Sequence, residues 1–220
     1  MKQHSSTVED YLKVIYKSST GAGLVSTNAI SKQLKTSPAS VTDMIKRLSD
    51  KKLVNYQPYK GVRLTAEGQK IALKIIRKHR LWEVFLVNVL KFSWDSVHET
   101  AEQLEHIDSP ELIEKLDEFL DFPKFDPHGD PIPSSTGEFV ERETTPLSEC
   151  EGGMVVTVAG VGEHSTDYLR YLDKIGLNIG VKVRVLEKID FDQSLMLDVK
   201  GREIVLSGEF SKRVLVLSDS

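Results

Sequence analysis

The 220-residue sequence lacks several features that would assign it to well-known protein classes. Its single cysteine, Cys150, excludes an internal disulfide framework and a CxxC-type zinc site. No apolar run approaches the roughly 20 residues of a membrane span, and the start, MKQHSSTVEDYLKVIY, has no apolar signal-peptide core. We therefore expect a globular cytoplasmic protein with no membrane partner.

Charge is present in both signs but is distributed unevenly. Residues 1–91 hold 17 Lys and Arg against 6 Asp and Glu, a net charge of +11, whereas residues 92–220 carry a net charge of −15. Solvated lysines on helix faces would give a basic segment without any partner. Because the excess extends over a whole predicted domain, it favours a polyanionic partner for the N-terminal part.

The first third of the sequence predicts a winged helix-turn-helix over residues 1–72. Residues 7–18, 27–35 and a stretch starting near Pro38 show helical spacing of apolar residues. The segment LVNYQPYKGVRLT follows, and its β-branched and aromatic residues around PYKG predict a hairpin. This order of elements is typical of a winged DNA-binding domain.

The predicted third helix has a small polar outer face, which permits close approach to the major groove, and the hairpin carries basic residues suited to phosphate. An ordinary amphipathic helix would show the same face, but the order of elements and the local charge favour DNA. The expected DNA-contacting residues are Thr7, Ser37, Pro38, Ala39, Ser40, Thr42, Asp43, Lys46, Arg47, Lys60 and Arg63.

The remaining sequence predicts two further regions. Residues 73–140 form a helical domain, with a long helix to about Lys91 whose second half is apolar nearly all round and therefore suits a subunit interface. Helices at about 93–106 and from Pro110 to Phe122 follow, and residues 122–146 hold five of the eight prolines. Short alternating runs over 146–220 predict a small all-β barrel. The expected fold is thus mainly α, followed by this barrel.

Histidines and carboxylates recur at helical spacing in the middle region. At about 100° per residue, His98, Glu102, Glu105 and His106 fall within an arc of roughly 100°. A lone His–Glu pair is commonly a surface ion pair, but several pairs in register indicate a divalent metal site. Only carboxylate and imidazole are offered, which suits Mn(II) or Fe(II) more than Cu(I) or structural zinc.

Six segments of the sequence carry a resemblance to a known family: EDYLKVIY, SPASVTDMIKRL, YKGVRLT, RKHRLWEVFL, VHETAEQLEH and FPKFDPHGDPIP. Together they resemble the diphtheria-toxin-repressor family of metal-dependent transcriptional regulators, within the manganese transport regulator branch that has a C-terminal SH3-like (FeoA-like) domain. The resemblance implies a homodimer that binds palindromic operator DNA when metal is bound and represses metal-uptake genes. It implies no organic cofactor and no enzyme activity.

The resemblance also implies the ligand sets. The primary site would use Asp10, Glu102, Glu105 and His106, and the second site His79, Glu83 and His98. Relatives carry CPHG where this sequence has DPHG, which makes Asp126 and His128 candidates, and the SH3-like domain would add Glu163 or His164. Two-metal members carry a second first-helix carboxylate where this sequence has Lys13.

The predicted effector is Mn(II), with Fe(II) second, and Zn(II) or Co(II) as substitutes in vitro. Metal would tie the first helix to the carboxylate cluster and select one spacing of the recognition helices. Three alternatives compete with this interpretation. They are an iron-dependent repressor of the same fold, a metallohydrolase that activates water, and a metal-free winged-helix sensor; the absence of an HExxH motif weakens the second.

Overall fold

The computed structural model describes residues 4–19 and 23–218. The chain forms two compact units, each assembled from separate stretches of sequence. The first contains residues 1–79, 102–115 and 133–138, and the second contains residues 80–101, 116–132 and 139–220. No helix in the described part of the chain is long and apolar enough to cross a membrane.

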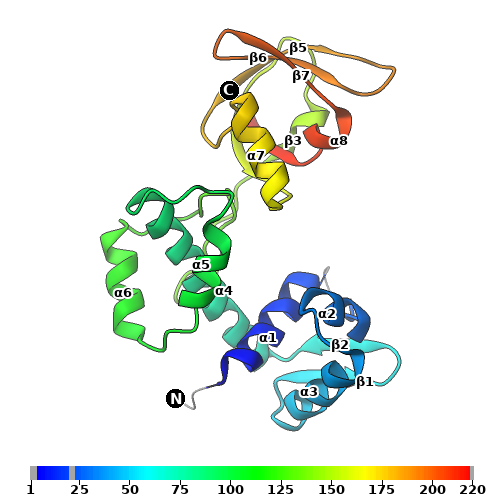
Figure 1. The fold of residues 1–220 in the computed structure, drawn as a ribbon, viewed down its shortest axis with the longest axis vertical. Coiled ribbons are helices and arrows are strands. Elements are labelled where there is room, and N and C mark those ends of the chain that lie inside the picture. The colour runs from blue at the N-terminus through cyan, green and yellow to red at the C-terminus, as the bar shows by residue number, and fades with distance from the viewer. Residues whose placement is uncertain (1–3, 20–22, 219–220) are drawn as a thin grey trace. The chain divides into compact units, whose positions relative to one another are not determined.

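The N-terminal part of the first unit is a winged helix-turn-helix, as the sequence predicts. Helices α1, α2 and α3 gather around the antiparallel hairpin of β1 and β2 (Figure 1). Their bounds are α1 (Ser6–Ser18), α2 (Thr27–Gln33), α3 (Pro38–Asp50), β1 (Val54–Gln57) and β2 (Gly61–Leu64). Val25 pairs with Val62 on the free edge of the hairpin and extends it by one bridge.

Apolar spacing and one cap fix the orientation of α3. Val41, Ile45 and Leu48 recur every three or four residues and are fully buried, which places the opposite face of the helix in solvent. The backbone N–H of Ser40 donates to Oγ of Ser37 at 3.1 Å, and Pro38 occupies the first turn, where its missing N–H costs nothing. The buried residues and the cap therefore fix which residues of α3 face solvent.

Three helices follow: α4 (Ala66–Asn88), α5 (Val97–Leu104) and α6 (Pro110–Phe119). The predicted helix over 93–106 is shorter at both ends than expected, because α5 begins at Val97 and ends at Leu104. Glu105 and His106 therefore lie in the turn that follows α5. The directions of the Glu105 and His106 side chains are therefore not set by the 100° per residue rotation of a helix.

The C-terminal part of the second unit is an antiparallel sheet in the order β3-β8-β4-β5-β6-β7, drawn from yellow-green to red in Figure 1. The sequence predicts a small all-β region here from its short alternating runs, but not β3, the 3₁₀ turn after it or the short α8. Leu169 and Leu172 of α7 are buried with Val156 and Val183 of the sheet, so α7 covers one face. The bounds are β3 (Thr145–Pro146), β4 (Val155–Val161), α7 (Thr166–Ile175), β5 (Lys182–Lys188), β6 (Leu195–Val199), β7 (Arg202–Leu206), α8 (Gly208–Ser211) and β8 (Val214–Ser218).

Candidate metal centres and DNA-binding surface

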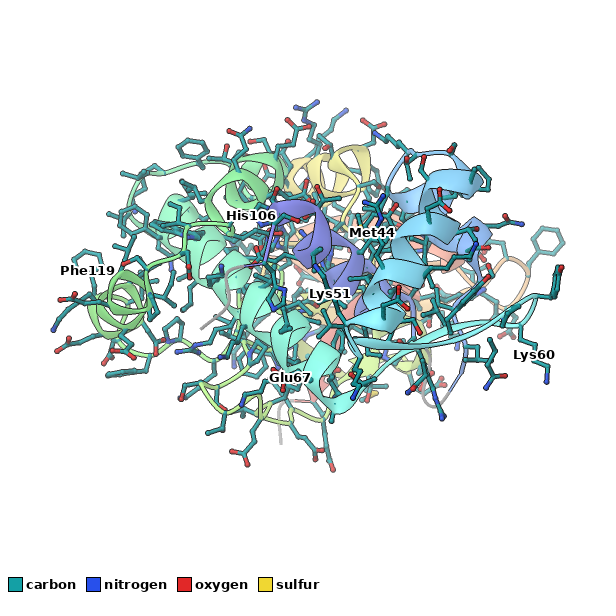
Figure 2. The ribbon with its side chains drawn as sticks, turned by 90° about the horizontal axis from the view of Figure 1, so that it is seen from below. Met44, Lys51, Lys60, Glu67, His106 and Phe119 are labelled. Carbon is teal, nitrogen blue, oxygen red and sulfur yellow. The ribbon has the colours of Figure 1, made fainter. Side chains whose placement is uncertain are left out.

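The first cluster of metal-ligating side chains lies between α1 and the turn after α5, within the first unit. Asp10, Glu105 and His106 each offer a donor atom, and these atoms lie within 4.8 Å of one another. Figure 2 shows His106 beside α1. Glu105 is fully buried, whereas the side chains of His106 and Asp10 are 23% and 37% exposed. We call this set the first centre.

The imidazole of His106 is oriented by a residue that the sequence analysis did not single out. Its Nδ1 lies 2.8 Å from Oε2 of Glu9, whose carboxylate can only accept, so Nδ1 carries the hydrogen. The other nitrogen, Nε2, lies 3.2 Å from Oδ1 of Asp10 and 3.7 Å from Oε1 of Glu105. In the neutral ring this nitrogen has a lone pair that faces two carboxylates, an arrangement that calls for a proton or a cation.

The ammonium group of Lys13 places a positive charge beside the first centre. Lys13 of α1 is 5% exposed, and its Nζ donates to Oε1 of Glu105 at 2.5 Å and to Oε1 of Glu102 at 3.3 Å. Glu102 is thus held by Lys13 and lies outside the cluster of three ligating residues. His79, which the resemblance assigns to another site, donates from Nδ1 to Oε2 of Glu105 at 2.5 Å.

The pKa values of this centre follow from burial and these contacts. Burial raises the pKa of Asp10, although the charges of His106 and Lys13 act against it. Burial alone would also raise the pKa of Glu105, but the hydrogen bond and charge of His79 and the charge of Lys13 outweigh it and lower the pKa. Glu105 is therefore held as an anion in a buried position.

The second cluster lies wholly within the second unit and is more deeply buried. Glu83 of α4 and Asp126 and His128 of the Pro-rich connection are 2%, 6% and 3% exposed, and their donor atoms lie within 4.8 Å of one another. Nδ1 of His98 lies 3.2 Å from Oε1 of Glu83. The structure thus brings Asp126 and His128 of the DPHG segment to Glu83, and we call this set the second centre.

His128 presents the same arrangement as His106. Its Nε2 donates to the carbonyl of Trp94 at 2.8 Å, because a carbonyl can only accept. Its Nδ1 then has a lone pair, and it faces Oε2 of Glu83 at 3.8 Å and Oδ1 of Asp126 at 3.9 Å. These separations are too long for hydrogen bonds. Three negative or lone-pair donors thus converge at this position, and the donor set fits a divalent cation.

Asp126 of the second centre accepts backbone N–H bonds from His128 and Asp130, and Arg80 lies beside it. Nε of Arg80 lies 3.5 Å from Oδ2 of Asp126, but the guanidinium makes its closer ion pair with Asp130, at 2.8 Å. Burial raises the pKa of Asp126 well above its ordinary value, and the neighbouring charges of Glu83 and Asp130 raise it further. Without a bound cation, repulsion between the carboxylates thus favours a proton on this centre.

The loop of the second centre is attached to strand β4 of the sheet. The N–H of Val161 donates to the carbonyl of His128 at 3.0 Å. Gly129 has a φ of +89°, and a Cβ there would lie 2.2 Å from the carbonyl oxygen of Ala159, so only glycine fits. The ring of His164 lies 5.1 Å from that of His128. Glu163, in contrast, pairs with Arg213 at 2.7 Å.

Each of the predicted DNA-contacting residues is exposed to solvent, apart from Thr42, which is half-buried. The hydroxyl of Thr42 donates to the carbonyl of Pro38 at 2.9 Å. Lys60 extends from the tip of the hairpin (Figure 2). Beside it, Tyr59 is fully exposed in a left-handed conformation with φ of 64°. Tyr59 is not among the residues predicted to contact DNA, although its place in the PYKG turn marks it as a wing-tip residue.

Comparison with known proteins accounts for nearly the whole chain. The family model for the iron-dependent repressor N-terminal DNA binding domain matches residues 3–62, that for the metal binding and dimerisation domain matches residues 65–134, and that for the FeoA domain matches residues 145–217. A solved structure described as a manganese-dependent transcriptional repressor in complex with manganese is 34% identical, with a TM-score of 0.82 over 96% of this chain and 99% of that chain. The chain belongs to the diphtheria-toxin-repressor family.

Two further members show the range of the family. The structure of ScaR with bound Cd²⁺ is 36% identical, with a TM-score of 0.77 over 96% of this chain and 99% of that chain. The diphtheria toxin repressor of Corynebacterium glutamicum is 29% identical over 200 residues, which are 86% of this chain and 87% of that protein. The family consists of metal-dependent, DNA-binding transcriptional repressors. The predicted class of function is confirmed, and the metallohydrolase and metal-free alternatives are wrong.

Proposed function

We propose that this member of the diphtheria-toxin-repressor family responds to manganese, binds palindromic operator DNA as a homodimer and represses genes for metal uptake. The carrying observation is that His106 and His128 each direct a ring nitrogen at two carboxylates while the other nitrogen is held by a fixed acceptor. Among the described residues, the side chains that form the two clusters offer imidazole and carboxylate donors. Such donors suit Mn(II).

We propose Asp10, Glu102, Glu105 and His106 as ligands of the first centre. Glu102 would join by turning from Lys13, since its side chain is half exposed. A divalent ion there would supply positive charge between α1 and the turn after α5. Glu9 holds the ring of His106, and His79 holds Glu105, so these two ligands each have a fixed partner that orients them.

We propose Glu83, Asp126 and His128 as ligands of the second centre, with His98 beside Glu83. Asp126 takes the position at which relatives carry cysteine in CPHG. His79 shares a helix face with Glu83 four residues later, so the set of His79, Glu83 and His98 also remains a proposal. His164 is the candidate from the SH3-like region, because its ring lies next to that of His128.

A homodimer is proposed from the exposed apolar residues of the second unit. Leu90, Phe92, Phe119 and Phe122 are 39% to 66% exposed, which is unusual for large apolar side chains unless a partner covers them. A two-fold dimer would present two recognition helices to half-sites about 34 Å apart, or a multiple of that distance. This symmetry supports a palindromic operator.

Iron is the second candidate effector, because the matching family models are described from iron-dependent repressors. The test is a titration of the chelator-stripped protein with Mn(II), Fe(II), Zn(II) or Co(II) on fluorescent promoter DNA from a manganese-uptake gene, at fixed salt. We expect tight binding with Mn(II) at concentrations where Fe(II) has no effect. Equal binding with and without metal would contradict the proposal.

The substitution Asp10→Ala tests the first centre. The substitution removes the proposed metal ligand that α1 contributes. We therefore expect metal-dependent DNA binding to weaken by at least about 100-fold, or 2.7 kcal/mol. The chain should remain a folded dimer. DNA binding by fluorescence anisotropy and dimerisation by sedimentation measure the two effects. Asp190→Ala, at an exposed position, is the matched control. An unchanged metal response in Asp10→Ala would refute the assignment.

A further inference from the structure

We propose that Asp43 selects a cytosine in the major groove of the operator, so that one position of each half-site must carry a C·G pair. The inference rests on the proposed function in so far as α3 is the helix that enters the groove. It concerns which base that helix selects, and it follows from one acidic side chain on a surface that otherwise suits a polyanion.

Asp43 lies on the line of α3 that points away from the core of its unit. The buried residues Val41 and Ile45 stand two positions before and after it. At about 100° per residue, each is rotated by roughly 160° from Asp43. Asp43 is exposed and belongs to the first half of α3, the half that contacts base edges when a recognition helix docks. Its carboxylate is therefore placed to meet bases rather than the outer backbone.

An acid at this position contrasts with the charge around it. Residues 27–64 hold eight Lys and Arg but two acids, Asp43 and Asp50. Phosphate groups on both sides of the groove repel a carboxylate, and removal of its hydration shell costs further free energy. Asp43 therefore weakens binding to DNA in general, unless a base in the groove donates a hydrogen bond to it.

The carboxylate of Asp43 is not engaged within the protein. Across residues 4–19 and 23–218, it takes part in no hydrogen bond or ion pair. Lys46 and Arg47 follow at three and four residues, the helical spacing of an ion pair, yet neither pairs with it. The carboxylate is thus available to accept a hydrogen bond from a ligand.

Asp43 also has a narrower hydrogen-bonding capacity than its polar neighbours on α3. The hydroxyls of Ser37 and Ser40 lie 2.9 Å apart and pair with each other. The hydroxyl of Thr42 donates to the carbonyl of Pro38 at 2.9 Å. A hydroxyl can donate or accept and therefore tolerates any base, whereas an ionised carboxylate can only accept. Asp43 consequently discriminates between bases more strongly than these hydroxyls do.

The major-groove edges of the bases decide which one suits a carboxylate. Guanine offers two acceptors, N7 and O6, and thymine offers the acceptor O4 beside a methyl group, so neither can donate. Adenine donates from N6, but this group lies between two acceptors, its own N7 and O4 of the paired thymine. Cytosine donates from N4, which has O6 of the paired guanine on one side and a C–H edge on the other. Repulsion is therefore smallest at cytosine.

The test is a selection of binding sites from duplex DNA in which palindromic half-sites are randomised. The full-length chain is loaded with Mn(II), or with Fe(II) if only that metal activates binding, and is compared with Asp43→Asn. We expect one position of each half-site selected by the unaltered chain to hold cytosine. In Asp43→Asn this position should change towards adenine, because an amide donates to N7 and accepts from N6, while the other positions stay unchanged.

Affinities for single duplexes give the size of the effect. Replacement of the selected C·G pair by G·C in one half-site should weaken binding by the unaltered chain roughly tenfold or more, but binding by Asp43→Ala less than about threefold. An unrelated duplex of the same length should bind Asp43→Ala more tightly than the unaltered chain, because a repulsive charge has been removed. Fluorescence anisotropy at fixed salt measures all of these affinities.

The control is Asp50→Asn, which removes the same charge from the same side of α3 at its last residue, away from the end that contacts bases. Its selected motif should match that of the unaltered chain. An unchanged motif in Asp43→Asn would overturn the inference, and so would a base other than cytosine at the position that this variant alters. The absence of any enriched motif with either metal would refute the proposed repressor function together with the inference, so the two failures are distinguishable.

Discussion

The two candidate metal centres contain similar side chains but neutralise them differently. At the first centre, the buried carboxylate of Glu105 has Lys13 on one oxygen and His79 on the other. At the second centre, Glu83 and Asp126 are buried together, and Arg80 approaches only one of them, at 3.5 Å. The first centre therefore holds a buried cation before metal binds, whereas at the second centre burial and the charges of Glu83 and Asp130 raise the pKa of Asp126. The comparison indicates that metal should stabilise the second centre more.

Among the variants that test this comparison, Glu105→Gln should cause the largest loss of stability in the metal-free protein. The substitution removes the closest partner of buried Lys13, and breaking a buried ion pair costs about 3–5 kcal/mol. We expect the metal-free melting temperature to fall by about 10 °C or more in a chain of this size, as measured by circular dichroism in chelator. Glu102→Gln is the control. Glu102 is half exposed, so its loss should cost at most about 1 kcal/mol; equal losses in both variants would contradict this account.

A smaller effect is expected from Asp126→Cys at the second centre. A thiolate in place of a carboxylate favours softer ions, so the preference for Zn(II) over Mn(II) should rise at least about tenfold, or 1.4 kcal/mol. Competitive dialysis with metal analysis measures the ratio. Asp130→Cys provides the comparison, because Asp130 pairs with Arg80 and lies outside the ligand cluster. A similar shift in both variants would argue against Asp126 as a ligand.

The smallest effect should have the opposite sign to that of Glu105→Gln. Glu83→Gln removes one of two buried like charges and leaves a polar side chain of the same length beside His98. We expect the metal-free protein to gain about 1 kcal/mol, a rise of about 2–4 °C in melting temperature, while Mn(II) no longer raises it further. Thermal melts with chelator and with Mn(II) give both numbers. A large metal-free loss of stability would show that the second centre is neutralised by other groups.

Local patterns in the sequence predict most of the fold. The apolar spacing of α3, the PYKG turn and the alternating strands of the sheet are set by neighbours a few residues apart. The winged helix-turn-helix and the order helical region then sheet were therefore accessible from the sequence alone. The misjudged boundary at α5 lies where Glu105 and His106 leave the helix to meet α1, a contact that local periodicity does not contain.

The composition of the centres was only partly predictable. The pattern identified Glu105 and His106, and the resemblance added Asp10, but neither showed that His79 would bond to Glu105 across 26 residues of sequence or Lys13 across 92. Lys13 was treated as a missing carboxylate rather than as a participant. Its spacing of three and four residues from Asp10 and Glu9 already placed it on their face of the helix. The position of Lys13 on the same helix face as Asp10 could therefore have indicated from the sequence that it contacts the carboxylates of the centre.

The attachment of the DPHG loop to the sheet has a consequence for the order of events during synthesis. The carbonyl of His128 is held by Val161 of β4, and β4 pairs along most of its length with β8, the final strand. A ribosome-bound chain that has exposed every proposed ligand of the second centre still lacks the strand that completes its support. We therefore expect a chain truncated before β8 to retain a winged helix-turn-helix but to have lost this point of metal control.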